Sequence, residues 1–553
     1  MLFNKKSLFF LILALALFLR LFQFGESPSS PYWEEVALGY DAYSISQTAR
    51  DHHGNFMPSV AFESFGDWKP SLYFYATVPF IKILGLNIFT VRLPTLLASL
   101  FIVLGIAVLA KTLFKHFYLK NDEKAADFIF YSSLFLASIS PWLLTFSRSA
   151  WESTLATALI LWGLNFWLFF VIENKSKWAI LAVFLLSLST YAYHSARITA
   201  PLLGLGLVLL YLQSYLHKKV KINWRAMFAS GLLAILLFSP IAFSLFQKTG
   251  QQRISETSIF TDLSIIEKSN ELRAAHDNSV WSRIIYHRYL FFAGEVAANF
   301  FDHFDFNYLF VSGDDNPRHS IQSFGEFYYL DLLFFVFAGI FFLHKRNKIT
   351  FFLFFYLFVA ILPAAFAKAT PHALRTLAAL PIFIVFLSFG LWQFLEIFKK
   401  ARTKSLVLAA LIAVYLVFAG LFFYQLIFIY PSKYKAEWQF GYQEMLAKLA
   451  AIEDNYDQIY ITREQGRPAM YYFFYNRIDP RLIQAFNDEA KKDQGEFLNF
   501  DKIEFIDQAK QISPVKKTLV VSSIDFYKNS FASSNAKIIS STQDQIWVLY
   551  EVK

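Results

Sequence analysis

Two adjacent carboxylates, Glu34 and Glu35, follow the first long apolar stretch of the chain. A carboxylate within hydrogen-bond reach of a hydroxyl or amine can take its proton as a general base. The pair begins what reads as an amphipathic helix at a membrane surface. A structural role is equally open, because carboxylates at the start of a helix interact favourably with its dipole. The residue types therefore allow either catalysis or helix capping.

Basic side chains recur in four further polar segments that separate apolar stretches. Guanidinium and ammonium groups are the donors that bind a phosphate. A single lysine or arginine at such a place can instead extend toward lipid headgroups. Taken together, the set predicts a phosphate-binding cavity beside Glu34 and Glu35. Its predicted ligands are Lys69, Arg148, Arg197, His372 and Arg375.

Aromatic and polar residues near these groups predict a pocket for a sugar or an acceptor, because aromatic rings can stack on a sugar face. The alternative for each ring is the aromatic belt that many membrane proteins place at the lipid–water boundary. The predicted pocket residues are Trp33, Tyr40, Asp41, Trp68, Tyr73 and His194.

Membrane helices must hold these residues in place. Of the 553 residues, 56% are hydrophobic and 17% are charged, against about 45–50% and about 25% in soluble domains. This composition excludes a soluble enzyme, a disordered protein and a fibrous rod. The chain has no cysteine, which excludes disulfides, iron–sulfur clusters, thiol catalysis and cysteine-based zinc sites.

A bilayer core about 30 Å thick is crossed by roughly 20 apolar residues in a helix. The first such segment is not expected to be a cleaved signal peptide, because the bulky Leu21-Phe22-Gln23-Phe24 follows it. About eleven spans are predicted. They are 7–24, 90–110, 127–145, 153–172, 178–193, 198–215, 226–245, 328–343, 349–366, 374–395 and 405–429.

Positive charges fall in alternate connections, on the side of Lys5 and Lys6, and this predicts that side to be cytoplasmic. The net charge of +9 is then explained by topology, and no nucleic-acid partner is expected. Residues 25–89 and 246–327 are predicted to face outward. The charges are Lys111, Lys115, Lys120, Lys124, Lys175, Lys177, Lys218, Lys219, Lys221, Arg225, Lys345, Arg346, Lys348, Lys399, Lys400, Arg402 and Lys404.

The composition changes after residue 430, where polar segments and alternating runs such as Gln458-Ile459-Tyr460-Ile461 replace the apolar stretches. Alternation of this kind is typical of half-buried strands. We expect a transmembrane catalytic domain over 1–430 and a small extracytoplasmic α/β domain over 431–553.

In their order, these residues resemble the GT-C class of multi-spanning glycosyltransferases, closest to bacterial and archaeal relatives of the protein O-mannosyltransferases and the aminoarabinose transferases. The resemblance implies a GT-C fold with Glu34 at the position of the catalytic base and Glu35 beside it. The usual pair is Asp-Glu, and the exchange of Asp for Glu leaves open which of the two glutamates carries the role. The resemblance also implies that Lys69 contacts phosphate. The motifs are Glu34-Glu35, Tyr40-Asp41-Ala42-Tyr43-Ser44, Arg50-Asp51-His52-His53-Gly54, Lys69-Pro70, Val91-Arg92-Leu93-Pro94, Phe146-Ser147-Arg148 and Pro371-His372-Ala373-Leu374-Arg375.

The reaction implied by the resemblance moves a monosaccharide from a polyprenyl-phosphate carrier to a hydroxyl or amine of a protein, lipid or glycan on the outer face, with inversion. The chain shows no Gly-rich phosphate loop after a strand, which favours a lipid-linked donor over a nucleotide sugar. Two alternatives stay open: a flippase or transporter of lipid-linked saccharides, although no internal repeat is visible, and an oligosaccharyl transferase.

No cofactor is predicted. Several histidines and aspartates in polar segments offer ligands for a divalent metal, but such residues are usually solvated surface. The turn-rich stretch 301–327 either covers the active site or is an ordinary loop. The possible metal ligands are His52, His53, Asp302, His303, Asp305, Asp314 and Asp315.

Overall fold

The computed structural model describes residues 4–118, 122–216, 222–245, 258–486, 492–493, 495–513, 517–531 and 536–552. They form two compact units. The first joins residues 1–22 to 95–426, and the second joins residues 23–94 to 427–553. Each unit therefore combines segments that are far apart in the sequence.

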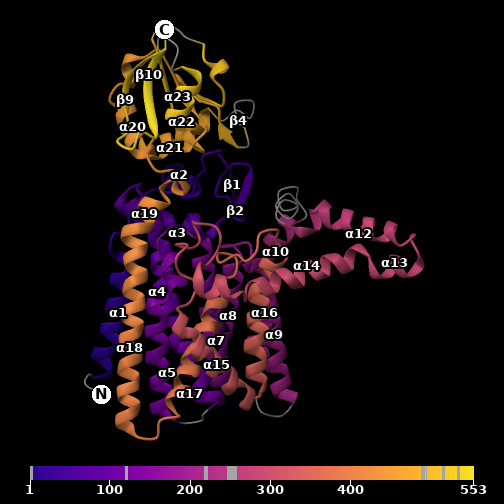
Figure 1. Cartoon of the computed structure of the whole chain (residues 1–553). Helices are drawn as coiled ribbons and strands as arrows, with labels where there is room; N and C mark the ends of the chain where they lie inside the picture. The colour runs from indigo at the N-terminus through magenta and orange to yellow at the C-terminus, as the bar shows by residue number, and fades with distance from the viewer. Residues whose placement is uncertain are drawn as a thin grey trace. The chain divides into compact units, whose positions relative to one another are not determined.

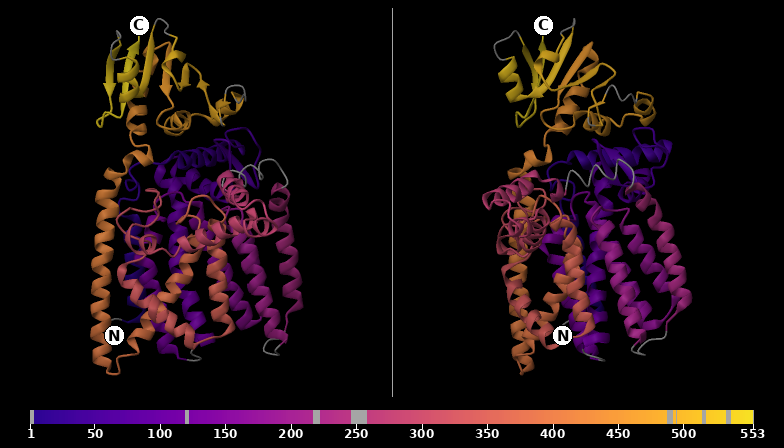
Figure 2. Two further views of the ribbon diagram at one scale, coloured as in Figure 1. Left: turned by 45° about the vertical axis from the view of Figure 1, so that its right-hand side comes forward. Right: turned by 90° about the vertical axis from the view of Figure 1, so that its right-hand side faces the viewer.

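The first unit contains a bundle of long helices that run side by side, and α12, α13 and α14 project from it (Figures 1 and 2). α4 begins in the second unit and continues into this one. The helices are α1 (Lys5–Leu21), α4 (Ile88–Leu113), α5 (Glu123–Ile139), α6 (Pro141–Thr145), α7 (Glu152–Glu173), α8 (Ser176–Ser189), α9 (Ala196–Leu216), α10 (Trp224–Leu245), α12 (Leu263–Ala275), α13 (Val280–Ile285), α14 (Arg288–Asp302), α15 (Tyr329–His344), α16 (Lys348–Ala365), α17 (Leu380–Leu395) and α18 (Ala401–Tyr424).

Each of the eleven predicted spans contains a helix, so the prediction of a helical, multi-pass membrane protein is confirmed. In the described residues, seven helical segments are long and apolar enough to cross a membrane; they contain α4, α7, α9, α10, α16, α17 and α18. The other four predicted spans are the shorter α1, α5, α8 and α15, of 14 to 17 residues.

Polar side chains fix several helix starts. Asn4 accepts a hydrogen bond from the Lys6 N–H, and Asp122 accepts one from Ala125. The Asn347 side chain accepts two at the start of α16. These caps satisfy N–H groups that have no partner within a helix. They set where α1, α5 and α16 begin.

Several of the charges predicted to be cytoplasmic lie together at one end of the bundle. Lys5 and Lys111, from α1 and α4, both bind Asp127 of α5, at 2.5 and 2.7 Å. α9 and α16 are joined as well, since Lys348 donates to Ser214. The side of the membrane that this end faces stays a prediction. Lys120, Lys218, Lys219 and Lys221 lie outside the described residues.

In the second unit, the helices of the segment 23–94 pack with helices of the C-terminal segment, and α2 contacts α3, α21 and α22. The helices are α2 (Trp33–Thr48), α3 (Leu72–Leu84), α19 (Tyr430–Lys433), α20 (Tyr442–Ala450), α21 (Pro468–Tyr475), α22 (Pro480–Ala485) and α23 (Ile524–Ser530). Two strands, β1 (Ala61–Ser64) and β2 (Asp67–Pro70), form a hairpin.

A six-stranded sheet in the order β6-β7-β3-β8-β10-β9 is the core of the C-terminal segment. β3 runs parallel to β7 and β8, whereas β6, β10 and β9 join antiparallel. The predicted α/β character of the tail is thus confirmed. The strands are β3 (Gln458–Thr462), β6 (Asn499–Phe500), β7 (Ile503–Ile506), β8 (Thr518–Ser523), β9 (Lys537–Ser541) and β10 (Trp547–Val552), with a separate pair, β4 (Lys492–Asp493) and β5 (Glu496–Phe497).

The helix that carries the acidic pair is α2, and the expectation that it is amphipathic is wrong. Every residue from Glu35 to Ala42 is buried, so all faces of the helix are covered over this stretch. Gly39 makes close packing possible, because a Cβ there would lie 2.6 Å from Val91 and 2.8 Å from Phe474. α2 is a core element of its unit.

Candidate functional site

Glu35 is bound on all sides by its own unit. Its two carboxylate oxygens each accept a 2.9 Å hydrogen bond from the Arg92 guanidinium, and one also accepts the Tyr32 N–H. Arg92 is fully buried and donates to the carbonyls of Pro28 and Ser30 as well. This fork-to-fork pair caps α2 and fixes the chain that enters it.

Glu34 has a different environment, although it is adjacent to Glu35 in the sequence. Its Oε1 lies 2.9 Å from Lys69 Nζ, and 39% of its side chain is exposed, against 6% for Glu35. Lys69 Nζ also lies 3.4 Å from Asp67. Glu34 is therefore the accessible carboxylate of the pair, and it is held by a cation.

The β1–β2 hairpin positions Lys69. Its two-residue turn is Phe65-Gly66, both at positive φ, as tight hairpins require. Opposite Lys69 in the register is Phe62, which is buried and stacks on Phe74 of α3 with ring centroids 4.2 Å apart. This anchor fixes the strand from which Lys69 extends.

Three of the predicted pocket residues are buried within the second unit. The Tyr40 hydroxyl donates to Ile478 O, and the Tyr73 hydroxyl donates to Val91 O. Asp41 accepts both the backbone N–H of His52 and a hydrogen bond from its ring. Because these groups hold the fold together, a contact with a sugar has no structural support. Trp68 lies on β2, opposite Glu63.

Trp33 lines a polar cavity of about 420 Å³ in the same unit. Its ring packs on Gly466, whose φ of +114° and close approach both exclude a side chain. The other lining residues are Gln439, Arg463, Glu464, Gln465, Gly466, Arg467 and Asp507. An aromatic face beside amide and charged groups is a surface that can hold a sugar. Sequence reasoning missed the C-terminal half of this cavity.

In the first unit, Arg148 is buried and donates to the carbonyls of Leu19, Arg20 and Phe22. These carbonyls end α1, and their own helix offers them no partner. The contacts are those of a residue that caps a helix. The predicted phosphate contact of Arg148 stays a prediction, and these bonds give it no support.

Arg197 and Arg375 differ from Arg148 because each keeps an unused donor. Arg197 Nε donates to Thr190 O, but its Nη2 is buried and has no hydrogen-bond partner among the described residues. Arg375 Nη1 is buried in the same way, with no partner in the described part of the chain. Buried donors without partners are costly, and an anion would satisfy them. His194 lies half-buried in the turn before Arg197.

An apolar cavity of about 680 Å³ lies among α7, α8, α9 and α10. Leu205 and Ile235 line it and are more than half exposed, so it opens at the surface of the bundle. Thr190, whose carbonyl binds Arg197, also lines it. The cavity is lined mainly by apolar side chains.

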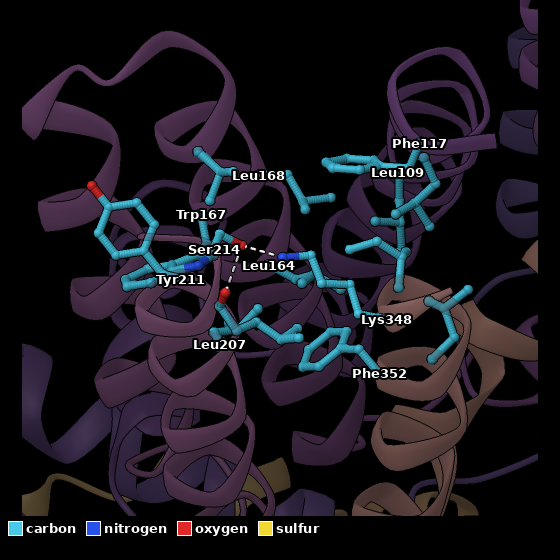
Figure 3. Close-up of a pocket in the computed structure, with 15 residues that line it drawn as sticks. Leu109, Phe117, Leu164, Trp167, Leu168, Leu207, Tyr211, Ser214, Lys348 and Phe352 are labelled. Atoms are coloured by element: carbon cyan, nitrogen blue, oxygen red, sulfur yellow. Dashed lines mark hydrogen bonds between the residues drawn. The ribbon is translucent and has the colours of Figure 1, made fainter. Parts of the chain in front are cut away.

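A second apolar cavity, between α4, α7, α9 and α16, is much smaller, about 60 Å³. Figure 3 shows its leucine and aromatic walls and the hydrogen bond from Lys348 to Ser214 at its edge. It is too small for a substrate. We interpret it as a packing defect.

His372 is one corner of a buried cluster. Its Nδ1 lies 3.8 Å from Asp314 Oδ2, which is 3.1 Å from His319 Nδ1. Burial, together with the nearby His319 and Arg375, lowers the pKa of His372 well below its usual value, so the ring is neutral. A neutral ring is a weak ligand for phosphate.

Among the predicted metal ligands, only Asp314 belongs to this cluster; the groups that can hold a metal in the described residues are Asp314, His319 and His372. His52 is bound to Asp41, and His303 to the backbone. Sequence spacing does not indicate the cluster, because 53 positions separate His319 from His372.

The predicted convergence of Lys69 with Arg197, His372 and Arg375 beside Glu34 joins residues of two units. It stays a prediction. Within each unit, the structure brings Glu34 together with Lys69, and His372 together with Asp314.

No model of a known protein family matches the chain, and no curated protein matches it. Solved structures do. ArnT from Cupriavidus metallidurans bound to undecaprenyl phosphate is 11% identical, with a TM-score of 0.56 over 99% of this chain and 98% of that chain. The same protein in the apo state, also 11% identical, gives 0.53 over the same shares.

An Archaeoglobus fulgidus oligosaccharyltransferase, in complex with Zn and sulfate, is 12% identical, with a TM-score of 0.48 over 86% of this chain and 61% of that chain. The two ArnT structures match nearly the full length of both chains. The chain therefore has the GT-C membrane glycosyltransferase fold, as predicted from the order of its motifs.

Proposed function

We propose that this protein is a membrane glycosyltransferase that moves a monosaccharide from a polyprenyl-phosphate carrier to an acceptor hydroxyl or amine on the outer face. The observation that carries the proposal is the division of the acidic pair: Glu35 is bound to Arg92, while Glu34 is exposed and held by Lys69. The GT-C fold supports it, and the ArnT that shares this fold was crystallised with undecaprenyl phosphate.

Glu34 acts as the general base. It takes the proton of the acceptor as the acceptor oxygen or nitrogen bonds to the anomeric carbon and the bond from that carbon to the phosphate oxygen breaks. The phosphate leaves as an anion without needing an acid, so one carboxylate suffices. A single displacement inverts the anomeric centre. Glu35 serves as a positioning residue that holds the first turn of α2 through Arg92.

The departing phosphate gains negative charge in the transition state, and fixed cations stabilise that charge. Lys69 supplies an ammonium beside Glu34. Arg197 and Arg375 supply buried N–H donors that lack partners among the described residues. In the first unit we assign Arg197 and Arg375 to the phosphate and leave Arg148 out, because its donors are bound to the end of α1. Lys69 belongs to the second unit, and its contact with the phosphate stays a prediction.

The carrier's chain occupies the apolar cavity among α7 to α10. Thr190 lines this cavity and accepts a hydrogen bond from Arg197, which supports a site for an anion next to an apolar tail. The acceptor sugar, or the sugar being moved, lies against Trp33 at the polar cavity.

The test compares Glu34→Gln with Glu35→Gln in purified full-length protein, given a panel of polyprenyl-phosphate sugars. Glu34→Gln should slow release of the sugar about 10²–10⁴-fold while the lipid still binds and the fold is intact. Glu35→Gln should instead lower the thermal unfolding temperature, because buried Arg92 loses its countercharge. Normal release in Glu34→Gln would refute the base assignment. A change in transbilayer lipid movement without any sugar release would indicate a flippase.

A further inference from the structure

Three side chains from two separate segments meet in the first unit. Asp314 and His319 lie in the loop between α14 and α15, and His372 lies in the turn that follows α16. One ligand atom from each lies within 4.8 Å of the others. Two imidazoles and one carboxylate thus bring the loop and the turn together.

The distances are close to those of a metal site, although they do not equal them. Two ligands that each lie about 2.0–2.2 Å from a tetrahedral Zn²⁺ are about 3.3–3.6 Å apart. The separations here are 3.1 Å from Asp314 Oδ2 to His319 Nδ1 and 3.8 Å from the same oxygen to His372 Nδ1. Small side-chain shifts would bring all three to one ion.

His372 Nδ1 is buried and has no hydrogen-bond partner in the described part of the chain. In the tautomer in which Nδ1 carries no proton, its lone pair faces Asp314 Oδ2. Two such acceptors repel each other. A cation between them removes that repulsion and satisfies both. Glu326, a second acid buried close to Asp314, also has an oxygen, Oε1, without a partner among the described residues.

Neighbouring groups hold the ligands in place. His303 Nδ1 donates to Asn299 O, and its Nε2 accepts the His372 N–H, so one neutral tautomer satisfies both contacts. The Ala373 N–H donates to Asp314 Oδ2 at 2.7 Å. Such partners orient ligands in metal sites. They also leave His303 unable to act as a ligand itself.

We propose that Asp314, His319 and His372 bind one divalent transition-metal ion, with Zn²⁺ the best match to two imidazoles and a carboxylate. The ion fastens the loop that follows α14 to the turn that carries Arg375. Three protein ligands leave a fourth position for water. The site is independent of the proposed transferase activity, because its residues bind the ion whatever reaction occurs elsewhere.

The test uses the purified full chain, stripped with a chelator and then titrated with Zn²⁺ and with Co²⁺. We expect one ion per chain, the visible absorption of tetrahedral Co²⁺, and an X-ray absorption spectrum with imidazole scattering around the metal. Asp314→Asn, His319→Gln and His372→Gln should each weaken binding at least about tenfold. His344→Gln is the matched control, since His344 is exposed and its ring bonds only its own helix.

Wild-type protein that takes up no ion, or a Co²⁺ spectrum without imidazole ligands, would overturn the proposal even if a variant failed to fold. Equal affinity in the three folded variants would overturn it too. The Asp314–His319 hydrogen bond would then be a plain structural clamp. If Glu34→Gln loses sugar transfer but keeps its metal content, the metal site is independent of the transferase activity, as proposed.

Discussion

Lys69 Nζ lies 2.9 Å from Glu34 Oε1. The two residues come from different elements, a strand of the β1–β2 hairpin and the first turn of α2, and they are 35 positions apart. The ion pair holds the Glu34 side chain against the β1–β2 hairpin. Under the proposed function, a donor phosphate competes for the same ammonium, and this competition frees Glu34 as its substrate arrives.

Lys69→Met is expected to raise the donor KM and lower kcat, because both the phosphate and Glu34 lose their cation. Lys69→Arg should restore part of the donor affinity but not full kcat, since a guanidinium differs from an ammonium in size and geometry. Steady-state kinetics with a polyprenyl-phosphate sugar measure both effects.

A double-mutant cycle tests whether the pair acts as a unit. If it does, Glu34→Gln combined with Lys69→Met should lose little more activity than the worse single variant. Losses that multiply would show that the two residues act separately.

Arg148→Met is expected to lower the thermal unfolding temperature and to leave the donor KM of the remaining folded protein unchanged. Each carbonyl of α1 that loses its donor costs about 1–3 kcal/mol, and Arg148 serves three of them. Arg375→Met should have the opposite effects: it should raise the donor KM and change the thermal unfolding temperature little. A raised KM in Arg148→Met would restore the original assignment of this residue to the phosphate.

Gly390→Ala is expected to destabilise the bundle by about 1–3 kcal/mol or more. A Cβ at Gly390 of α17 would lie 1.9 Å from the Phe334 carbonyl oxygen of α15, and a helix backbone cannot yield there. Gly420→Ala in α18 is the control, because nothing lies within 4 Å of its Cβ. Thermal unfolding in detergent compares them, and equal effects of the two changes would contradict the packing argument.

Glu496 should make the second unit less stable as the pH rises toward 7. Burial raises the pKa of Glu496 to about 7, even though Arg467 and Arg463 oppose the shift. The folded state then binds a proton, between about pH 4.3 and 7, that the unfolded chain has lost. Its stabilising contribution is complete below about pH 4.3 and is lost as the pH rises through 7.

Glu496→Gln removes this titration. The unfolding temperature of the variant relative to wild type should increase from pH 5 to pH 7 and then level off. The difference in the free energy of unfolding should change by up to about 1.4 kcal/mol per pH unit. Parallel curves for the two proteins would show that Glu496 does not titrate in this range.

The sequence by itself determined the class of this protein. Runs of about twenty apolar residues form helices for local reasons, namely hydrogen bonding within the chain and burial away from water. All eleven predicted spans contain helices, and the alternating pattern near residue 458 is indeed a strand. The order of short motifs was enough to indicate the GT-C fold.

Only the tertiary structure distinguished Glu34 from Glu35, or Arg148 from Arg375. Each pair has the same residue type, so the difference lies in which distant group each side chain reaches: Lys69, Arg92, or the carbonyls that end α1. The same reason applies to Asp314, His319 and His372. Contacts between residues that are tens or hundreds of positions apart depend on how helices and loops pack. Spacing along the chain does not predict them.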